Sequence, residues 1–296
     1  MNYQHGFHAG NFADVHKHAV LALILVHLRL KPAAFRVIDS HAGAGRYDLY
    51  ASESTRGGEW HGGIQQIWNA YPPPHAPPLE RQGDGQGGDE AQVLLAPYLQ
   101  VVRALNPEKK LRIYPGSPVI AQSLMRSQDR LIACEFEPRS AAALKAVLRG
   151  DSRVKVLSID GWMALGATVP PKERRGIVLV DPPFEDVADF MRLSSTLAVM
   201  HRKWPSGIYM LWYPIKDRAA PDALAGRLRS LALPKVLRCE ITLAPPRADA
   251  GLIGSGLIVV NPPFTLEPDL RLLLPTLGKI FSSTAAHRID WLATER

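Results

Sequence analysis

The chain has 296 residues, of which 35 are Lys or Arg and 28 are Asp or Glu, and its formal net charge is +7. Its 46% hydrophobic and 21% charged residues are typical of a globular protein and exclude overall disorder. Two cysteines, Cys134 and Cys239, are too few for a disulfide framework, which favours a reducing compartment. The excess of basic residues favours a polyanionic partner.

The first predicted element is a helix over residues 14–31. Asn11 is a candidate N-cap, Asp14 lies in the first turn where the helix dipole favours a carboxylate, and Pro32 ends the helix. The longest aliphatic run in the chain lies in this helix and is far shorter than the roughly 20 residues of a membrane span. We therefore expect a cytoplasmic protein with no membrane partner.

Seven short apolar runs follow, with the continuity expected of strands buried on both faces. They span residues 35–39, 131–137, 154–160, 176–184, 207–215, 236–243 and 256–264. Helix-compatible segments lie between several of them, at 139–148, 187–201 and 221–231. This alternation predicts a doubly wound α/β fold. Because the last two runs have only a short connection, we expect a parallel sheet that ends in an antiparallel hairpin.

Residues 50–115 interrupt the alternation between the first two strands. They contain two helix-like segments separated by residues 72–90, in which nine of 19 residues are Pro or Gly. That composition is typical of a flexible loop. We therefore predict a small inserted helical subdomain at 50–115. The main domain comprises 1–49 and 116–296, with an N-terminal helical segment at 1–34.

A glycine turn, HAGAG at 41–45, follows the strand that ends in Asp39. Gly43 and Gly45 have no Cβ and let the backbone approach a ligand closely. The dinucleotide fingerprint is not matched, because position 48 is Asp and no acidic residue ends a second strand at the expected offset of about 20 residues. The turn favours a nucleotide-type ligand, and its departures from the fingerprint disfavour NAD and an oxidoreductase.

Acidic residues follow the next three strands, at Glu135, Asp160 and Asp181. Ligands of open α/β sheets bind outside the carboxyl ends of the strands. The two oxygens of Glu135 are candidates to hold two ribose hydroxyls, and Asp160 is a candidate acceptor for an adenine amino group. Helix capping is the alternative explanation for any one of these carboxylates.

The tetrapeptide DPPF at 181–184, directly after the run GIVLV, indicates a specific reaction. An exocyclic adenine amine is a poor nucleophile, because its lone pair is delocalised into the ring. Asp181 and the carbonyl of Pro182 can each accept one N–H of that amine, and the prolines hold the carbonyl rigidly. Phe184 offers a stacking face for an extruded base. We therefore predict Asp181, Pro182 and Phe184 as catalytic residues of a methyl transfer to adenine N6.

A second tetrapeptide of this kind, NPPF at 261–264, also follows an aliphatic run. DPPF follows the fourth strand counted from the glycine turn, which places it near the point where the strand order reverses. NPPF follows the last predicted strand, in the hairpin. We therefore expect NPPF to be a structural strand stop far from the ligand.

Four histidines near the N-terminus raise the question of a metal site. His16 and His18 are two residues apart and do not share a helical face, and no Cys or acidic residue completes a zinc set. We predict no metal.

Basic side chains give weaker indications of a nucleic-acid contact. Arg46 lies beside the glycine turn, and Lys172, Arg174 and Arg175 form a cluster. All four are candidate phosphate contacts, because arginine and lysine bind phosphate. A solvated surface is the alternative interpretation of the cluster.

Several motifs in register along the chain carry a resemblance to a known family. They are YQHGFHAGNFADVHKH (3–18), DSHAGAGRYDL (39–49), YPGSP (114–118), DGW (160–162), DPPF (181–184), LWYP (211–214) and GSGLIVVNPPF (254–264). Together they resemble the bacterial 23S ribosomal RNA adenine-N6 methyltransferase J family. The first motif combined with HAGAGRY and YPGSP is the most specific part. Phe184 departs from the family's commoner tyrosine and keeps the stacking face.

The resemblance implies a Rossmann-like class I methyltransferase fold with an inserted helical subdomain. It implies S-adenosylmethionine as methyl donor, S-adenosylhomocysteine as product, and one adenosine of 23S rRNA as target. The donor site it implies comprises His18, His41, Ser117, Glu135, Asp160 and Gly161, and we add Gly43, Gly45 and Asp181. By the same resemblance Tyr3 contacts the RNA, and Asp181 is the catalytic acceptor.

The sequence thus predicts an enzyme that methylates N6 of a single adenosine in 23S rRNA. We expect a monomer with no obligate protein partner. Two alternatives remain open at this point. A DNA adenine-N6 methyltransferase shares the catalytic tetrapeptide, and a catalytically silent RNA-binding protein can share the fold.

Overall fold

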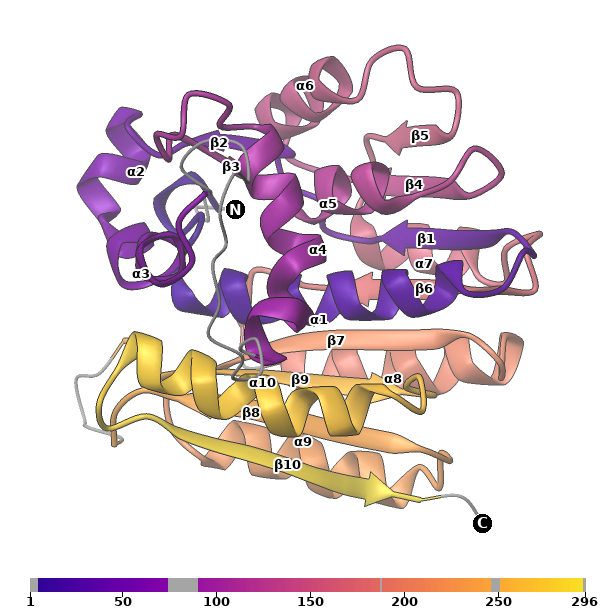
Figure 1. Ribbon diagram of the computed structural model, residues 1–296. Coiled ribbons are helices and arrows are strands. Elements are labelled where there is room, and N and C mark those ends of the chain that lie inside the picture. The colour runs from indigo at the N-terminus through magenta and orange to yellow at the C-terminus, as the bar shows by residue number, and fades with distance from the viewer. Residues whose placement is uncertain (1–4, 74–89, 187, 246–250, 295–296) are drawn as a thin grey trace.

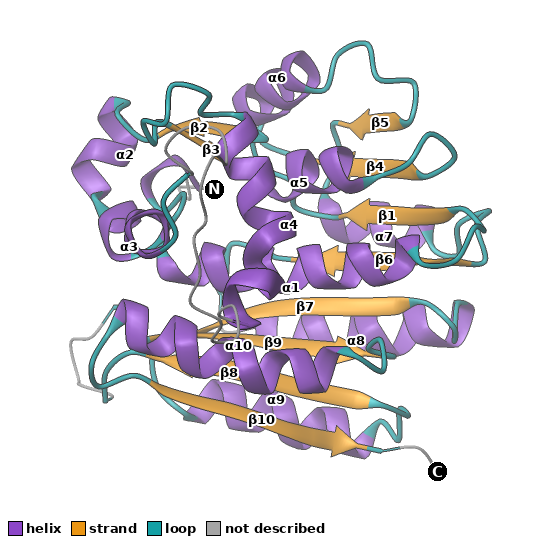
Figure 2. Ribbon diagram, viewed as in Figure 1, coloured by secondary structure: helices purple, strands orange, loops and turns teal. Residues whose placement is uncertain are grey.

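The computed structural model describes residues 5–73, 90–186, 188–245 and 251–294. Within these residues one eight-stranded sheet crosses the molecule, with helices on both of its faces (Figures 1 and 2). Its strand order is β10-β8-β9-β7-β6-β1-β4-β5. Two further strands, β2 (Arg46–Asp48) and β3 (Ile113–Pro115), form a separate antiparallel pair.

Five neighbouring strands of the large sheet are parallel, as the sequence predicts. They are β1 (Phe35–Asp39), β4 (Arg130–Cys134), β5 (Val154–Leu157), β6 (Arg175–Val180) and β7 (Ile208–Ile215). Their near-continuous apolar sequences follow from burial on both faces. Along β6, Ile177 and Leu179 belong to one apolar core, and Val178 and Val180 belong to the core on the other face.

The antiparallel end of the sheet differs in detail from the predicted hairpin. Strand β9 (Gly254–Val260) pairs with both β7 and β8 (Val236–Thr242), so it lies between them. A further strand, β10 (Ala286–Ala293), pairs with β8 at the edge of the sheet. Strands β8 and β9 therefore form the predicted antiparallel hairpin, and β10 is an additional strand that the sequence analysis did not predict. Strand β10 was not predicted, because an exposed edge strand lacks the continuous apolar run of a central strand.

Helices cover the two faces of the sheet in separate layers (Figure 2). One layer contains α1 (Phe12–Arg29), α4 (Glu90–Ala104), α5 (Ser117–Leu124), α6 (Pro138–Val147) and α10 (Leu266–Phe281). The other contains α7 (Gly161–Thr168), α8 (Ala188–Lys203) and α9 (Ala219–Ser230). No helix of the described residues is both long enough and apolar enough to cross a membrane.

Helix α1 is buried along most of its circumference, so its polar side chains lie inside the protein. The predicted N-cap is present, because the side chain of Asn11 accepts from the backbone N–H of Asp14 at 2.9 Å. His16, Lys17 and His18 are each at most 4% exposed. Buried polar groups of this kind require partners, and those partners define the site described below.

The segment 50–115 contains α2 (Ser52–Gly57), η2 (Glu59–Gly62) and α3 (Ile64–Ala70), followed by α4. A second 3-10 turn, η1 (His5–Phe7), precedes α1. Trp60, Ile64 and Leu95 belong to the same apolar core as α1. Most of the predicted loop at 72–90 lies outside the described residues, and the division of the chain into domains stays a prediction.

Candidate active site

The parallel strands end together at one edge of the sheet, called the carboxyl edge here. Asp39 at the end of β1 is in register with Ala133 of β4 and with Leu179 of β6. Residues that follow these positions therefore meet. The register brings together the glycine turn, Glu135 and Asp181, as the sequence predicts.

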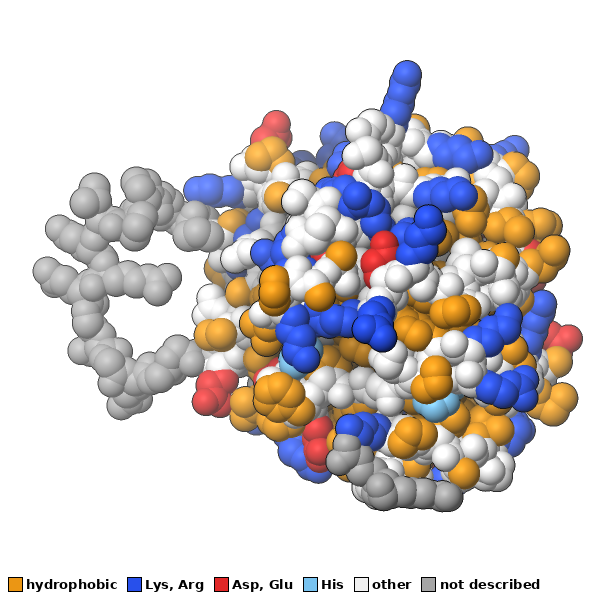
Figure 3. All heavy atoms as spheres, turned by 90° about the vertical axis from the view of Figure 1, so that its right-hand side faces the viewer, with side chains coloured by type: hydrophobic (Ala, Val, Ile, Leu, Met, Phe, Trp, Pro, Cys, Tyr) orange, Lys and Arg blue, Asp and Glu red, His pale blue; other side chains and the backbone are white. Residues whose placement is uncertain are grey.

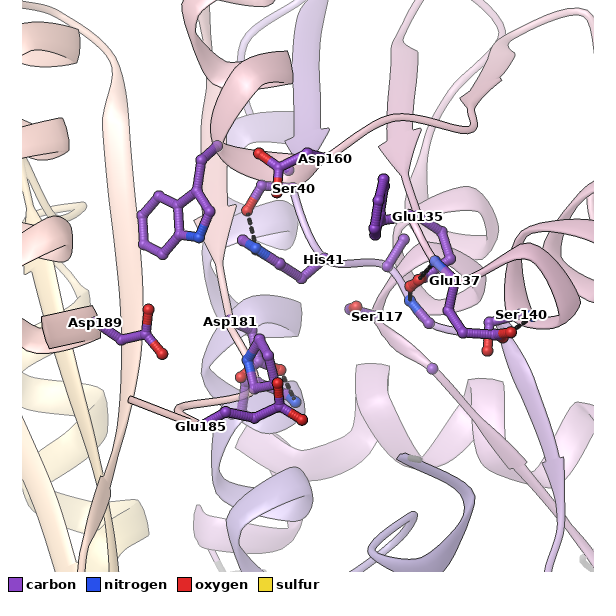
Figure 4. A pocket seen from close by; sticks show the side chains of 18 of the residues that line it. Ser40, His41, Ser117, Glu135, Glu137, Ser140, Asp160, Asp181, Glu185 and Asp189 are labelled. Carbon is purple, nitrogen blue, oxygen red and sulfur yellow. Dashed lines mark hydrogen bonds and ion pairs between the residues drawn. The ribbon is translucent and has the colours of Figure 1, made fainter. Parts of the chain in front are cut away.

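A cavity of about 270 Å³ lies at this edge, and we call it the first cavity. Its wall includes the predicted residues His18, His41, Gly43, Ser117, Glu135, Asp160, Gly161 and Asp181. Figure 4 shows many of these side chains converging from different strand ends. Gly45 is not part of the wall. Its carbonyl accepts a hydrogen bond of 2.8 Å from the N–H of Gly116, which does line the cavity.

Two glycines allow close packing in the wall of the first cavity. Gly43 has a φ of +62°, and a Cβ at this position would lie 2.2 Å from the hydroxyl of Tyr47. A Cβ on Gly161 would lie 2.1 Å from the carbonyl oxygen of Ser40. Both distances are far below van der Waals contact, so the backbone can reach this geometry only without a side chain.

Glu135 is held by the backbone around it. One carboxylate oxygen accepts from the N–H of Gly43 at 2.8 Å and the other from the N–H of Glu137 at 2.7 Å. Burial raises the pKa of Glu135, and the backbone hydrogen bonds oppose that rise. Each carboxylate oxygen has a second lone pair, so the residue can still accept two hydroxyl groups from a ligand.

Asp160 is the N-cap of α7, because its side chain accepts from the N–H of Met163 at 2.9 Å. The capping interpretation therefore holds for this residue, which also faces the first cavity. The guanidinium of Arg192 on α8 lies 4.0 Å from the carboxylate of Asp160 and 4.7 Å from the ring centroid of Trp162. Arg192 and Trp162 also line the cavity. Trp162 belongs to the DGW motif quoted above, whereas Arg192 was not predicted.

Behind Ser117 lies a buried carboxyl group, Asp39. The hydroxyl of Ser117 donates to Asp39 at 2.7 Å, and Asp39 is 1% exposed. Burial raises the pKa of Asp39 to about 7, and the nearby charge of Asp181 adds to the rise. Ser117, which lines the first cavity, is thus held by a residue that is not part of the cavity wall.

The two predicted histidines are also fixed by neighbours. His18 shares a 2.8 Å hydrogen bond between its Nδ1 and the hydroxyl of Tyr114, and Tyr98 donates to that hydroxyl at 3.1 Å. Nδ1 of His41 lies 2.8 Å from the hydroxyl of Ser40. Burial lowers the pKa of His41 to about 4, so its imidazole is neutral at physiological pH.

Sequence reasoning missed the main partner of Asp181, which is Lys17. The ammonium of Lys17 donates both to Asp181 and to Asp14, at 2.8 Å in the second case. Burial alone would lower the pKa of Lys17, but the two carboxylates raise it overall, so the ammonium stays charged. The Asp14–Lys17 spacing on one helix was visible in the sequence, but the contact with Asp181 spans 164 positions and was not.

A second cavity of about 570 Å³ adjoins the first. Lys17, Asp181, Pro183 and Glu185 line both cavities, so Asp181 stands where they meet. The wall of the second cavity includes the aromatic rings of Phe7, Phe184 and Trp212. Phe184 has a φ of +50°, and its ring packs against Phe190 and Trp212 at centroid distances of 4.8 and 5.6 Å. Pro182 itself is buried.

The first cavity is strongly acidic. Among the described residues seven Asp or Glu line it, whereas Lys17 and Arg192 are its basic residues. Such a wall disfavours the two phosphates of a dinucleotide and favours a ligand with positive charge. The same wall shows no group of three His, Cys, Asp or Glu side chains arranged to hold a metal ion, within the residues the structure describes.

The predicted RNA contacts are dispersed. Arg46 is exposed on β2, beside the glycine turn. Lys172, Arg174 and Arg175 lie at or just before the amino end of β6. Arg175, the nearest of them along the chain, is six residues and roughly 20 Å from Asp181. Arg175 donates to the carbonyls of Leu28 and Ala33, so it holds the end of α1. Figure 3 shows this amino edge, on which many Lys and Arg side chains gather. Tyr3 lies outside the described residues.

The second tetrapeptide is at the amino edge as well. Strand β9 is antiparallel, and its last residue, Val260, is in register with Tyr209 near the start of β7. The side-chain amide of Asn261 donates at 2.8 Å to the carbonyls of Pro205 and Gly207. NPPF is therefore a structural stop, as predicted.

Comparisons with known proteins agree with this architecture. The family model described as "Ribosomal RNA large subunit methyltransferase D, RlmJ" matches residues 32–78 and 86–293. Two proteins named ribosomal RNA large subunit methyltransferase J, from Escherichia coli (strain K12) and Haemophilus influenzae, are each 36% identical over the full length of both chains. A crystal structure of a Legionella pneumophila protein has 30% identity and a TM-score of 0.83, and covers 96% of this chain and 98% of its own.

The sequence resemblance and the fold therefore lead to the same assignment. Most of the motifs quoted above fall at the carboxyl edge, in the wall of the two cavities, or in the helix that supports them. The exception is GSGLIVVNPPF, which forms β9 and ends at the amino edge. The chain belongs to the ribosomal RNA large subunit methyltransferase J family.

Proposed function

We propose that this protein transfers a methyl group from S-adenosylmethionine to N6 of one adenosine in 23S rRNA. The chain is a methyltransferase of the family named above. The observation that carries the finer assignment is the position of Asp181 at the junction of an acidic cavity and an aromatic one.

The first cavity fits the methyl donor. S-adenosylmethionine supplies a methyl group already activated by a positive sulfur. The acidic wall favours this cation, and the backbone of Gly43 and Gly161 is part of that wall. Glu135 would hold the ribose hydroxyls, Asp160 and Gly161 would lie beside the adenine, and Ser117, His18 and His41 would complete the wall.

The second cavity fits the target base. Phe184 and Trp212 offer flat faces to an adenine that has left its stack, and stacking of this kind contributes about 1–3 kcal/mol per base. Asp181 would then accept an N–H of the exocyclic amine. That hydrogen bond concentrates electron density on N6 and orients it toward the first cavity. Proximity and orientation supply most of the rate when the donor is already activated.

Lys17 prepares Asp181 for this role. Its ammonium donates a hydrogen bond to Asp181 and holds the carboxylate in one orientation. Asp14 in turn holds Lys17 through a second ion pair. Because Lys17 stays protonated, it acts as a positioning residue and cannot serve as a general base.

The same proposal includes expectations about the oligomeric state, the location and the RNA contacts of the protein. We propose that the enzyme acts as a monomer in the cytoplasm, where ribosomal RNA is assembled. Lys172 and Arg174 remain candidate phosphate contacts for parts of a large RNA that extend beyond the site. Arg46 is a nearer candidate, because it is exposed beside the glycine turn.

The decisive experiment compares methyl transfer from labelled S-adenosylmethionine to 23S rRNA and to adenine-containing DNA. We expect transfer to the RNA, with N6-methyladenosine found at one position by mass mapping. Transfer to DNA alone would support the alternative DNA methyltransferase. Donor binding without transfer to either polymer would support a catalytically silent RNA-binding protein.

A further inference from the structure

We propose that residues Tyr50, Trp60 and His61, called the aromatic platform here, bind an unpaired nucleotide of the RNA next to the target adenosine. This inference rests on the proposed function and extends it to a surface outside both cavities. It assigns a task to the segment that follows the glycine turn and to the first helices of the insertion.

The platform consists of two exposed rings supported by a buried one. Trp60 is 4% exposed, and the ring of His61 stacks on it with a centroid distance of 3.8 Å and an interplanar angle of 28°. Tyr50 is 52% exposed, and its ring contacts Trp60 at a centroid distance of 5.7 Å. His61 is also exposed. The indole of Trp60 thus supports the rings of Tyr50 and His61, which are accessible to solvent and to a base.

Basic side chains surround these rings. The ammonium of Lys110 lies 5.4 Å from the ring centroid of Tyr50. Arg46, Arg56 and Lys109 are exposed on the neighbouring strand, helix and turn. Aromatic faces among basic side chains are the combination with which proteins bind single-stranded nucleic acid, since the rings stack on bases and the cations bind phosphates. An unpaired stretch of RNA is therefore the partner that fits.

The platform is rigidly connected to the second cavity through Glu59. Glu59 lines that cavity and directly precedes Trp60. Its two carboxylate oxygens bind the ring of His8 at 2.8 Å and the side-chain amide of Asn11 at 2.9 Å. Both partners also line the cavity. A nucleotide stacked on the platform would thus lie a short way along the RNA from a base held in the cavity.

An exposed aromatic residue at the other edge provides a matched control. Phe264 is 85% exposed and also contacts a histidine ring, that of His27, at a centroid distance of 5.5 Å. It follows Asn261 at the amino edge of the sheet, away from both cavities. A general preference of RNA for exposed aromatic rings would affect Phe264 and Tyr50 alike.

The test measures binding of a fluorescein-labelled, single-stranded polyadenylate RNA by fluorescence anisotropy without methyl donor. We expect Tyr50→Ala and His61→Ala each to weaken binding by about fivefold or more, as the loss of one stacked base predicts. Tyr50→Phe keeps the ring and should bind like the wild type, and so should Phe264→Ala. Donor affinity and melting temperature, measured alongside, should stay at wild-type values in the Tyr50 variants.

Binding by Tyr50→Ala and His61→Ala within twofold of the wild type would overturn the platform. So would an equal loss of binding in Phe264→Ala. Because this readout needs no methyl transfer, it separates the two proposals. If the wild-type protein methylates no RNA but Tyr50→Ala still loses polyadenylate binding, the proposed function is refuted and the aromatic platform is supported. A raised KM for 23S rRNA in Tyr50→Ala would support both.

Discussion

The two edges of the parallel sheet carry similar tetrapeptides with different tasks. At the carboxyl edge, DPPF follows β6 and places Asp181 between two cavities. At the amino edge, NPPF follows β9 and uses Asn261 to tie two backbone carbonyls together. The two tetrapeptides differ only in their first residue, Asp181 or Asn261. The direction of the preceding strand determines the edge of the sheet at which each tetrapeptide lies.

The edges also differ in how they treat buried carboxylates. Asp39 at the carboxyl edge has a hydroxyl partner, Ser117, and burial raises its pKa to about 7. Asp129 at the amino edge is equally buried, but Arg126 binds it and lowers its pKa overall against the effect of burial. The two buried carboxyl groups therefore differ in their partners: Asp39 has a hydroxyl group, whereas Asp129 has a cation that compensates its charge.

The largest effect is expected from Asp181→Asn. The amide removes the negative charge that concentrates electron density on the target nitrogen, so methyl transfer should fall by about 10²- to 10⁴-fold. Calorimetry should show donor binding retained. The matched variant at the other edge, Asn261→Ala, should keep its transfer rate and lose about 1–2 kcal/mol of unfolding free energy with its hydrogen bonds. Normal turnover by Asp181→Asn would contradict the catalytic role of Asp181, which distinguishes DPPF from NPPF.

Lys17→Met is expected to cost about 3–5 kcal/mol of unfolding free energy, because it leaves two carboxylates buried without their cation. Urea denaturation measures this loss. The double variant Lys17→Met/Asp14→Asn should recover part of it, since one of the two uncompensated charges is gone. Single and double variants with equal stability would show that Asp14 and Lys17 are not coupled.

The pH dependence of stability should have opposite signs at the two edges. The folded protein retains a proton on Asp39 that the unfolded chain releases, so Asp39 makes stability fall as pH rises from about 4 to 7. Asp39→Asn keeps an acceptor for Ser117 and should remove this fall, which is on the order of 2–4 kcal/mol. Melting temperatures of both proteins from pH 4 to pH 8 test this, and parallel curves would contradict it.

Asp129 gives the opposite dependence. Its pKa is lowered in the folded protein, so its contribution is present above the usual pKa of 3.8 and is lost as pH falls. Asp129→Asn should therefore lower the melting temperature at pH 7 more than at pH 3. This variant serves as the amino-edge counterpart of Asp39→Asn.

The smallest effect is expected from Phe184→Ala. Loss of one stacking face should raise the KM for RNA by about 5- to 150-fold, which corresponds to about 1–3 kcal/mol. Phe184→Tyr restores the family's commoner residue and should keep the wild-type KM. Phe264→Ala should leave methylation kinetics unchanged, and a comparable rise in its KM would show that the amino edge also binds the target segment.

Much of the fold could be predicted from the sequence, because buried elements leave strong local patterns. The continuous apolar runs of β1, β6 and β7 and the capped helix α1 are visible from residue types alone. The edge strand β10 was not, since half-exposed strands mix polar and apolar residues. Strand β9 was recognised as a strand, but its position between β7 and β8 depends on pairing that no local pattern specifies.

The sequence by itself determined which residues could form a donor site, because glycines and carboxylates at successive strand ends must meet in a parallel sheet. Only the tertiary structure decided that Lys17 holds Asp181, that Arg175 lies away from the site, and that a second, aromatic cavity adjoins the first. The physical reason is range. Local sequence specifies strands, turns and caps, whereas Lys17 reaches Asp181 only when helix α1 packs against the folded sheet.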